Sequence, residues 1–574
     1  MSSNSSSDDC LALAKQWLHG CQSLHVDCRR PDPPLLPTRV IEVGQTDGEA
    51  RILVTREGVR GDYAVLSHSW GEAKPTTLLK SNLAAMQRKL ALNEQSKTFR
   101  DALHVTRSLG LRYLWIDSLC ILQDKDDRAD WSSEAPKMST VYNSATVMLS
   151  AENAVDTTEG LFPNSDACST HSTARRLSAT AKSGVEIFVR RRQHHPLDAR
   201  LAVHFAGQID EPHLRSRGWC LQEQLLSPRI LHFRKEELAW TCSTCSRCEC
   251  RIRPTLPPPH PFRASPDSIT ERDKPRNTYE LSMQWPSLVM DYTRRHLTYA
   301  DDRVHALSGL ANYMEESTTD TYYCGLWYED LRFQLLWYVD RQSLEEAKVQ
   351  QPTARFHFPY APSWSWMSVP GPINYFERYP AGSAPRHPAI RSADAVEPLG
   401  FVLNVGRFPV DRDNLVGTLV MAPVYLFTQV LPVHYEAETG LWTPLCKVPD
   451  FESDNLRVYL DVLSDHPDRT KETDFFLVLG GRWVGQGMTY ECMQAVCILA
   501  RQLPKAAEAL VQYARQFQMQ YGAEVTPGGG GDLDAANENL PTMDRAYERI
   551  GLVRGAGSIK EWGRVTPWER AWLF

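Results

Sequence analysis

The stretch YAVLSHSWG, residues 63–71, joins four apolar residues to a polar segment. A short apolar run closed by a glycine, here Gly71, is typical of a buried strand. A second run, YLWI at residues 113–116, is apolar throughout, as expected of a strand that is covered on both faces. Between the two runs, residues 78–90 and 96–110 carry apolar side chains at helical spacing. This pattern predicts neighbouring strands connected by helices.

The alternation continues along the chain. Further helices are predicted at residues 130–142 and 218–226, and further strands at residues 145–149, 230–233 and 238–242. Because strands that alternate with helices usually form a parallel sheet with helices on its faces, residues 61–250 are predicted to be α/β. The expected fold class is a mostly parallel, doubly wound sheet.

A proline-rich segment, residues 254–266, is typical of a linker and marks a domain boundary. Beyond it the pattern first suggests helices and then, from about residue 364, short β-like runs. The chain is therefore predicted to consist of an appended N-terminal segment (1–45), an α/β domain (46–252), a proline-rich linker with a helical region (253–345) and a β-rich C-terminal region (346–574).

The composition excludes several classes of protein. The 574 residues are 42% apolar and 23% charged, which is ordinary for a globular protein. A net charge of -7 and a pI near 6.2 argue against nucleic acid as a partner. The first ten residues, MSSNSSSDDC, lack both the basic and the apolar region of a secretory signal. We therefore expect a cytoplasmic protein, with the nucleus as the alternative, whose 14 cysteines are reduced.

One uncharged stretch, residues 415–433, is long enough to cross a membrane. It contains Pro423 and Pro432 together with several polar residues. Two prolines in a single bilayer helix are less favourable than two buried strands joined by a turn. No membrane span is therefore predicted.

Three motifs together resemble the fungal heterokaryon-incompatibility (HET) domain proteins. They are residues 63–71, residues 98–124 with the sequence LWIDSLCILQD at their end, and residues 217–233 with RGWCLQE followed by LSPRILHF. Their order and spacing make the resemblance specific, and it covers about residues 61–250. Looser similarity extends to residues 302–310 and 362–366. His68 departs from the family, which usually has another aromatic residue at that position.

The resemblance implies a role in self/non-self recognition. When genetically different hyphae fuse, proteins of this kind trigger the death of the mixed cell. The implied partner is an unknown incompatibility protein, and self-association into a homo-oligomer is a further expectation, because death-signalling modules often self-associate. The resemblance leaves the chemistry open.

A more distant resemblance, to TIR domains, bears on the chemistry. TIR domains open with a similar strand, and one of their helices carries W-C-x-x-E, whose glutamate serves in NAD+ cleavage. This chain has the same pattern from Trp219 to Glu223, at a longer distance from the strand. By this resemblance Glu223 is the candidate catalytic carboxylate and NAD+ the candidate substrate. One carboxylate suffices, because the leaving nicotinamide is already charged and the transition state resembles an oxocarbenium ion.

Polar residues that follow the predicted strands are candidates for substrate binding, since ligands of open α/β sheets bind beyond the carboxyl ends of the strands. They are Ser67, His68, Trp70, Asp117, Cys120 and, on the helix of Glu223, Trp219. Acyl hydrolysis with Ser67 or Cys120 as nucleophile is disfavoured, because no G-x-S-x-G elbow is present.

Two alternatives remain open for this region. Glu223 could be a surface carboxylate paired with a nearby arginine, such as Arg217 or Arg229. The domain could then be a non-enzymatic signalling module, which would expose an apolar patch and leave Glu223 in solvent. An enzyme instead requires Glu223, Asp117 and residues 67–70 to converge on one crevice.

The cysteines offer two groups of potential zinc ligands. The first is the C-x2-C-x2-C-x-C sequence of Cys242, Cys245, Cys248 and Cys250. Four thiolates can complete a tetrahedral zinc site, but structural sites usually take two pairs of ligands far apart in sequence. Since four ligands within nine residues would strain the peptide, no metal is expected; the alternative is a site shared with a distant ligand. The second, looser group is Cys21, His25 and Cys28.

Overall fold

The structure, a computed structural model, divides into two compact units, and each is described by itself. The first unit comprises Met1–Arg276, Arg295–Thr298 and His305–Ser317, and the second comprises the remaining residues. The described residues are 8–162, 175–177, 187–189, 213–249, 278–346 and 361–378, apart from residues 31, 47, 72–74, 125, 128, 153, 235, 236 and 298–301, together with the strands between residues 395 and 573. The predicted linker at residues 254–266 lies outside them.

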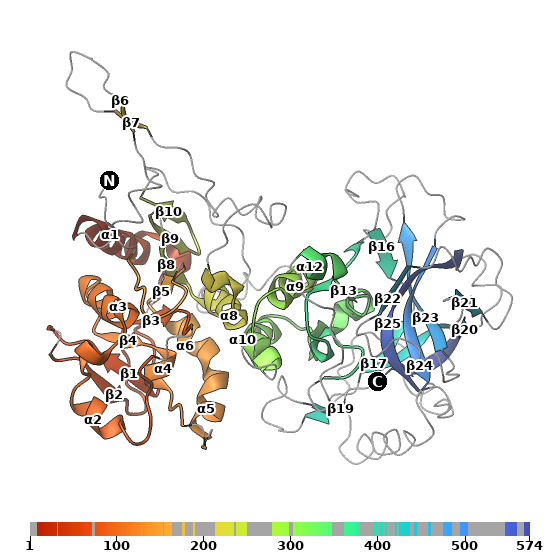
Figure 1. The fold of residues 1–574 in the computed structure, drawn as a ribbon, viewed down its shortest axis with the longest axis horizontal. Helices are drawn as coiled ribbons and strands as arrows, with labels where there is room; N and C mark the ends of the chain where they lie inside the picture. Colours follow the sequence, from red (N-terminus) through yellow and green to blue (C-terminus); the bar gives the residue numbers. More distant parts are fainter. Residues whose placement is uncertain are drawn as a thin grey trace. The chain divides into compact units, whose positions relative to one another are not determined.

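An eight-stranded sheet forms the centre of the first unit (Figure 1). The strands follow one another across the sheet in the order β10-β9-β8-β5-β3-β4-β1-β2. They are β1 (Arg39–Glu42), β2 (Arg51–Val54), β3 (Tyr63–Ser67), β4 (Tyr113–Trp115), β5 (Val147–Ala151), β8 (Arg229–Phe233), β9 (Leu238–Cys242) and β10 (Ser246–Cys248). A separate hairpin pairs β6 (Arg175–Leu177) with β7 (Ile187–Val189).

The sheet is mixed, whereas the sequence predicted a mostly parallel one. Strands β4, β3, β5 and β8 are parallel to their neighbours in this order. The flanking pairs β1–β2, β1–β4, β8–β9 and β9–β10 are antiparallel. Short connections account for the pairs β1–β2, β8–β9 and β9–β10, because a few residues suffice to join antiparallel neighbours, whereas parallel neighbours need a long crossover. The antiparallel pair β1–β4 joins segments that are far apart in sequence. The fold class of the first unit is therefore α/β with a mixed sheet.

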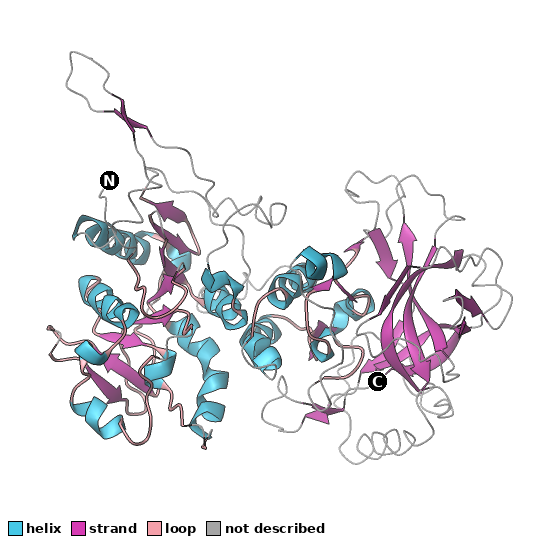
Figure 2. Ribbon diagram, viewed as in Figure 1, coloured by secondary structure: helices cyan, strands magenta, loops and turns pink. Residues whose placement is uncertain are grey.

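Helices flank the sheet of the first unit (Figure 2). They are α1 (Asp8–Leu24), α2 (Leu83–Arg88), α3 (Lys97–Ser108), α4 (Asp117–Cys120), α5 (Ala129–Glu134), α6 (Met138–Ser144) and α8 (Gly218–Leu226), with short 3-10 turns η1 (Val26–Cys28), η2 (Leu92–Glu94), η3 (Ala135–Lys137) and η4 (His213–Ser216). The helix predicted at residues 130–142 is interrupted at η3. Pro136 explains the break, because proline cannot donate the backbone hydrogen bond that a continuous helix requires.

The N-terminal residues contribute to the core of the first unit. Leu11 and Leu18 of α1 and Ile41 of β1 are buried in the same hydrophobic cluster as β3, β4 and β5. Helix α1 contacts α3 and β9, and β1 pairs with β4. The described part of the segment predicted as an appendage, residues 1–45, is thus packed against the sheet.

The second unit contains a helical part with a tryptophan-rich core. Its elements are α9 (Thr278–Thr293), η7 (Tyr328–Asp330), α11 (Leu331–Gln334), α12 (Arg341–Glu346), η8 (Trp366–Ser368) and the short strands β11 (Tyr322–Tyr323), β12 (Leu326–Trp327), β13 (Tyr338–Val339) and β14 (Ile373–Asn374). Helix α10 (Asp302–Ser317) begins in this unit, and its residues from His305 onward belong to the first.

Gly325 organises this core. The indole nitrogens of Trp285 and Trp366 both donate to its carbonyl oxygen, at 2.7 and 2.9 Å. Its φ of +89° and a distance of 2.8 Å from an added Cβ to the Trp366 ring leave no room for a side chain. The SWSW sequence at residues 363–366 is therefore a packing motif.

The strands between residues 377 and 573 form a sheet of ten strands. They are β15 (Glu377–Arg378), β16 (Ala395–Pro398), β17 (Phe401–Val405), β20 (Val424–Glu436), β21 (Leu441–Pro444), β22 (Arg457–Leu460), β23 (Phe475–Val484), β24 (Gln494–Gln502), β25 (Ala546–Ser558) and β26 (Trp568–Leu573), with β18 (Phe408–Pro409) and β19 (Leu419–Met421) as a separate pair. The described residues of the uncharged stretch 415–433 lie in β19 and β20. Among the described residues, none of the helices combines the length and the apolar character of a membrane span.

Candidate functional site

Three predicted residues meet where β3 and β4 end. Because these strands are parallel neighbours, with Val65 opposite Trp115, the chain leaves both at the same edge of the sheet. The indole nitrogen of Trp70 donates to Asp117 Oδ2 at 3.0 Å, and His68 Nε2 lies 4.0 Å from Asp117 Oδ1. The loops after the first two strands predicted from the sequence therefore converge on Asp117.

His68 is a neutral, buried member of this group. Burial, which outweighs the opposite effect of Asp117, together with Arg217 lowers the pKa of His68 to about 4. Its ring packs edge-on against Phe99, and its Nε2 atom has no hydrogen-bond partner. Because the imidazole is uncharged at neutral pH, its approach to Asp117 is a dipolar contact and not an ion pair.

Glu223 lies on α8 and turns toward the same edge. Its side chain is buried, with only 7% of the residue exposed. On the preceding turn of the helix, Cys220 Sγ accepts a weak hydrogen bond from the Ser67 hydroxyl at 3.9 Å. The predicted alternative of a solvent-exposed glutamate does not describe this side chain, since α8 presents this face to the end of β3.

The carboxyl group of Glu223 is destabilised in its ionised form. Burial, with a smaller contribution from Asp117, raises the pKa of Glu223 to about 7. The hydroxyls of Ser67 and Tyr142 and the guanidinium of Arg217 oppose this rise. Its Oε2 atom is buried without a hydrogen-bond partner. A buried carboxyl group with a raised pKa and an acceptor atom that lacks a hydrogen-bond partner is a frequent property of functional sites.

Arg217 and Tyr142 complete the site. Arg217 precedes α8 and donates from Nη1 to the His68 carbonyl oxygen at 2.7 Å. Tyr142 of α6 is buried beside Glu223 and donates its hydroxyl to the Leu66 carbonyl oxygen at 3.2 Å. The sequence carries no signal for Tyr142, because a tyrosine at an apolar helix position has the same pattern as any core residue.

Close packing at Gly71 and a hydrogen bond to Gln222 hold two elements of the site in place. Gly71 has a φ of +61°, and a Cβ there would lie 2.2 Å from Cβ of Asp156, in the segment after β5. Only glycine allows this close approach. Gln222 Oε1 of α8 accepts a hydrogen bond from the Gly309 amide at 2.9 Å. The positions of the Trp70 loop and of α8 are thus set by contacts outside the site.

Two predicted site residues, Cys120 and Trp219, belong mainly to the packed core. Cys120 is buried, and burial raises the pKa of its thiol to about 12. Since the thiolate is the nucleophilic form, this cysteine is a poor nucleophile at neutral pH. Trp219 is half-buried and packs against the hydrophobic core of the first unit.

A second polar cluster lies at the same edge, where β5 and β8 end. Glu152 follows β5, with Oε1 at 2.5 Å from His232 Nδ1 and Oε2 at 2.8 Å from Arg234 Nε. His232 Nε2 in turn contacts the Thr241 hydroxyl at 3.0 Å. Burial acts to raise the pKa of Glu152, but Arg234, His232 and Arg215 hold it well below its usual value. This carboxylate is thus ionised and fully engaged.

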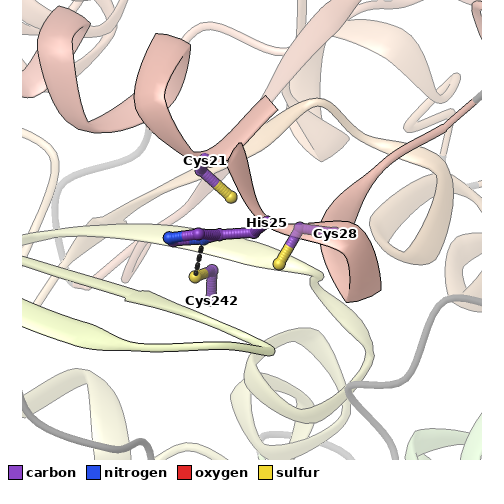
Figure 3. Close-up of side chains that lie close together, drawn as sticks. All are labelled: Cys21, His25, Cys28 and Cys242. Atoms are coloured by element: carbon purple, nitrogen blue, oxygen red, sulfur yellow. Dashed lines mark hydrogen bonds between the residues drawn. The ribbon is translucent and has the colours of Figure 1, made fainter. Parts of the chain in front are cut away.

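The two groups of potential zinc ligands meet at the other end of β8 and β9. Cys242, the last residue of β9, lies against Cys21, His25 and Cys28 (Figure 3). Cys245 and Cys248 follow in the same hairpin, and Cys250 lies outside the described residues. The four residues that meet are the strongest metal-ligating set among the described residues.

The fold and the site define an α/β protein with a polar site at the carboxyl edge of its parallel strands. Residues 63–223 match the family model described as heterokaryon incompatibility protein (HET). The chain therefore carries a HET domain over residues 63–223, and the resemblance indicated by the three sequence motifs is confirmed for this part of the chain. Comparison with curated proteins and with solved structures gives no significant match.

Proposed function

We propose that this protein acts in fungal self/non-self recognition and that its HET domain brings about cell death by cleaving NAD+ between nicotinamide and ribose. The observation that carries the chemical part is Glu223. Its carboxyl group is buried next to Ser67 and Tyr142, within electrostatic range of Asp117, and keeps a free acceptor atom. The family match of residues 63–223 carries the cellular part.

The order of the parallel strands supports this proposal. Strands β4-β3-β5-β8 correspond to the order 2-1-3-4 when β3 is counted as the first strand. That order belongs to flavodoxin-like sheets, in which ligands bind where neighbouring strands connect in opposite directions. Here the corresponding point lies between β3 and β5, and β3 ends at Ser67. The proposal is that the HET domain shares this TIR-like arrangement.

The chemistry needs few protein groups. Water adds to C1′ of the ribose, nicotinamide leaves with the electrons of the glycosidic bond, and one proton is released. The ionised carboxylate of Glu223 stabilises the cationic character of the ribose in the transition state. Asp117, whose side chain is 28% exposed, adds negative charge nearby, and the half-buried Trp70 offers an aromatic face to the nicotinamide ring. Since Glu223 is buried, substrate entry requires a local opening of the loops.

The test is nicotinamide release from NAD+ by the purified full chain, followed by chromatography. Glu223→Gln is expected to lower kcat by about 100-fold or more, because it removes a charge that acts in the transition state. The matched control is Glu57→Gln, at an exposed turn residue, which should leave the rate unchanged. Because the carboxylate is the active form, the rate of the parent protein should rise with pH through the pKa of about 7.

Two results would contradict the enzymatic proposal. One is that the purified, folded protein leaves NAD+ intact although its expression kills cells. The other is that the Glu223→Gln variant kills cells as efficiently as the parent protein does. Both would favour the alternative, a signalling module that acts by self-association or by binding a partner protein. That alternative predicted a solvent-exposed Glu223, and the burial of this residue lends it no support.

A further inference from the structure

Four side chains from distant parts of the chain form one compact group of metal ligands in the first unit (Figure 3). Cys21 lies near the end of α1, His25 and Cys28 lie in the turn that follows, and Cys242 ends β9. Their ligand atoms all lie within 4.8 Å of one another. We propose that Cys21, His25, Cys28 and Cys242 bind one structural zinc ion.

The distances fit this ion. Zinc binds thiolate sulfur at about 2.3 Å and imidazole nitrogen at about 2.0–2.1 Å, which places tetrahedral ligand atoms about 3.5–3.8 Å apart. His25 Nδ1 and Cys242 Sγ are already 3.4 Å apart. Because no two ligand atoms in the group are more than 4.8 Å apart, displacements of about 1 Å or less close the site.

The ligand set and its spacing also fit. Three thiols and one imidazole make a Cys3His set, which is common in structural zinc sites. Cys21, His25 and Cys28 supply three ligands from one short segment, and Cys242 supplies the fourth from a strand far along the chain. This division avoids the strain that four ligands within residues 242–250 would impose.

Arg229 provides an independent indication of negative charge at this place. It lies directly opposite Cys242 in the β8–β9 pair and is only 2% exposed. Its Nε donates to Cys21 Sγ at 3.3 Å, and its Nη2 donates to the carbonyl oxygen of Cys28. None of its contacts within the described residues is a carboxylate. A buried guanidinium requires a compensating charge, and a zinc ion with three thiolates and one imidazole carries a net charge of -1.

Backbone contacts support the same assignment. The amide of Cys245 donates to Cys242 Sγ at 3.4 Å, and such bonds orient and stabilise metal-bound thiolates. Cys245 Sγ itself lies 3.9 Å from both His25 Nε2 and Cys242 Sγ. Cys242 is nevertheless the fourth ligand, because its sulfur is the one that lies within 4.8 Å of all three N-terminal ligand atoms.

The role of the ion follows from where its ligands lie. It joins the segment of α1 and η1 to β9, near the edge of the eight-stranded sheet. Because these elements are separated by most of the domain sequence, one metal site closes a long loop and fixes the N-terminal helix on the core. We expect the site to be structural, since four protein ligands leave no open coordination position.

The experiment is elemental analysis of the full chain, purified without chelator from zinc-supplemented cells. We expect one zinc per chain, and well below half of that in Cys21→Ser and in Cys242→Ser. The matched control is Cys10→Ser, which also lies buried in α1 but whose thiol contacts Glu249; it should retain one zinc. If a variant fails to fold, cobalt substitution of the parent protein remains decisive, because tetrahedral thiolate coordination gives characteristic absorption bands.

Several outcomes would overturn the proposal. They are absence of metal from the folded parent, retention of a full equivalent in both Cys21→Ser and Cys242→Ser, or a disulfide between these cysteines in protein kept under cytosolic redox conditions. Loss of zinc in Cys245→Ser with retention in Cys242→Ser would overturn the ligand assignment. All these measurements are independent of NAD+ cleavage, so the zinc proposal stands or fails separately from the proposed function.

Discussion

Glu152 and Glu223 are two buried glutamates at the same edge of one sheet, and their electrostatic states are opposite. Glu152 lies between Arg234 and His232, and its pKa is held well below the usual value. Glu223 faces hydroxyl groups and Asp117, and its pKa is raised to about 7. Burial is common to both. The presence of a directly bonded cation therefore distinguishes a carboxylate that stabilises the fold from one that remains available for a ligand.

The largest expected effect tests whether the ion pair between Glu152 and Arg234 stabilises the fold. Glu152→Gln should lower the free energy of unfolding of the first unit by about 3–5 kcal/mol, because it leaves the buried charge of Arg234 uncompensated. Thermal and urea unfolding of the full chain would measure the change. The double variant Glu152→Gln/Arg234→Met should recover part of the loss. A loss below about 1 kcal/mol in the single variant would show that the cluster is not a stabilising ion pair.

The next effect has the opposite sign and tests Glu223. Its folded pKa of about 7 exceeds the ordinary value of 4.5, so the folded state binds the extra proton and stability is lost as pH rises between these values. Glu223→Gln removes this loss and should stabilise the protein by at most about 3 kcal/mol at pH 8, with little difference near pH 4. Unfolding curves over this pH range would show it. Parallel pH profiles for variant and parent would contradict the assigned pKa.

The smallest expected effect concerns the loop above Glu223. Trp70→Phe removes the hydrogen bond to Asp117 and keeps the aromatic face. It should cost about 1 kcal/mol of stability, the usual contribution of one hydrogen bond. If Trp70 also stacks on nicotinamide, the KM for NAD+ should change by only a few-fold. Loss of more than about 3 kcal/mol would mean that the indole is a core residue and not part of the site.

Local patterns predicted much of the first unit. The apolar runs at residues 63–66 and 113–116 lie in β3 and β4, and the helix expected at residues 218–226 is α8. These elements are predictable because burial on both faces requires uninterrupted apolar residues, and an amphipathic helix requires its own period. The prediction of one continuous helix over residues 130–142 was wrong in the middle. Pro136 interrupts the helix there, although the apolar residues keep helical spacing.

The motifs in the sequence also identified the HET domain and the residues at the ends of β3 and β4, because these residues are local in the chain. Partners brought from distant segments could not be identified in the same way. Tyr142 beside Glu223, Arg234 beside Glu152 and Cys242 beside Cys21 each depend on packing between elements that are far apart in sequence. The pKa of a buried carboxyl group and the completeness of a metal site depend on such neighbours, and it is the folded arrangement that supplies them.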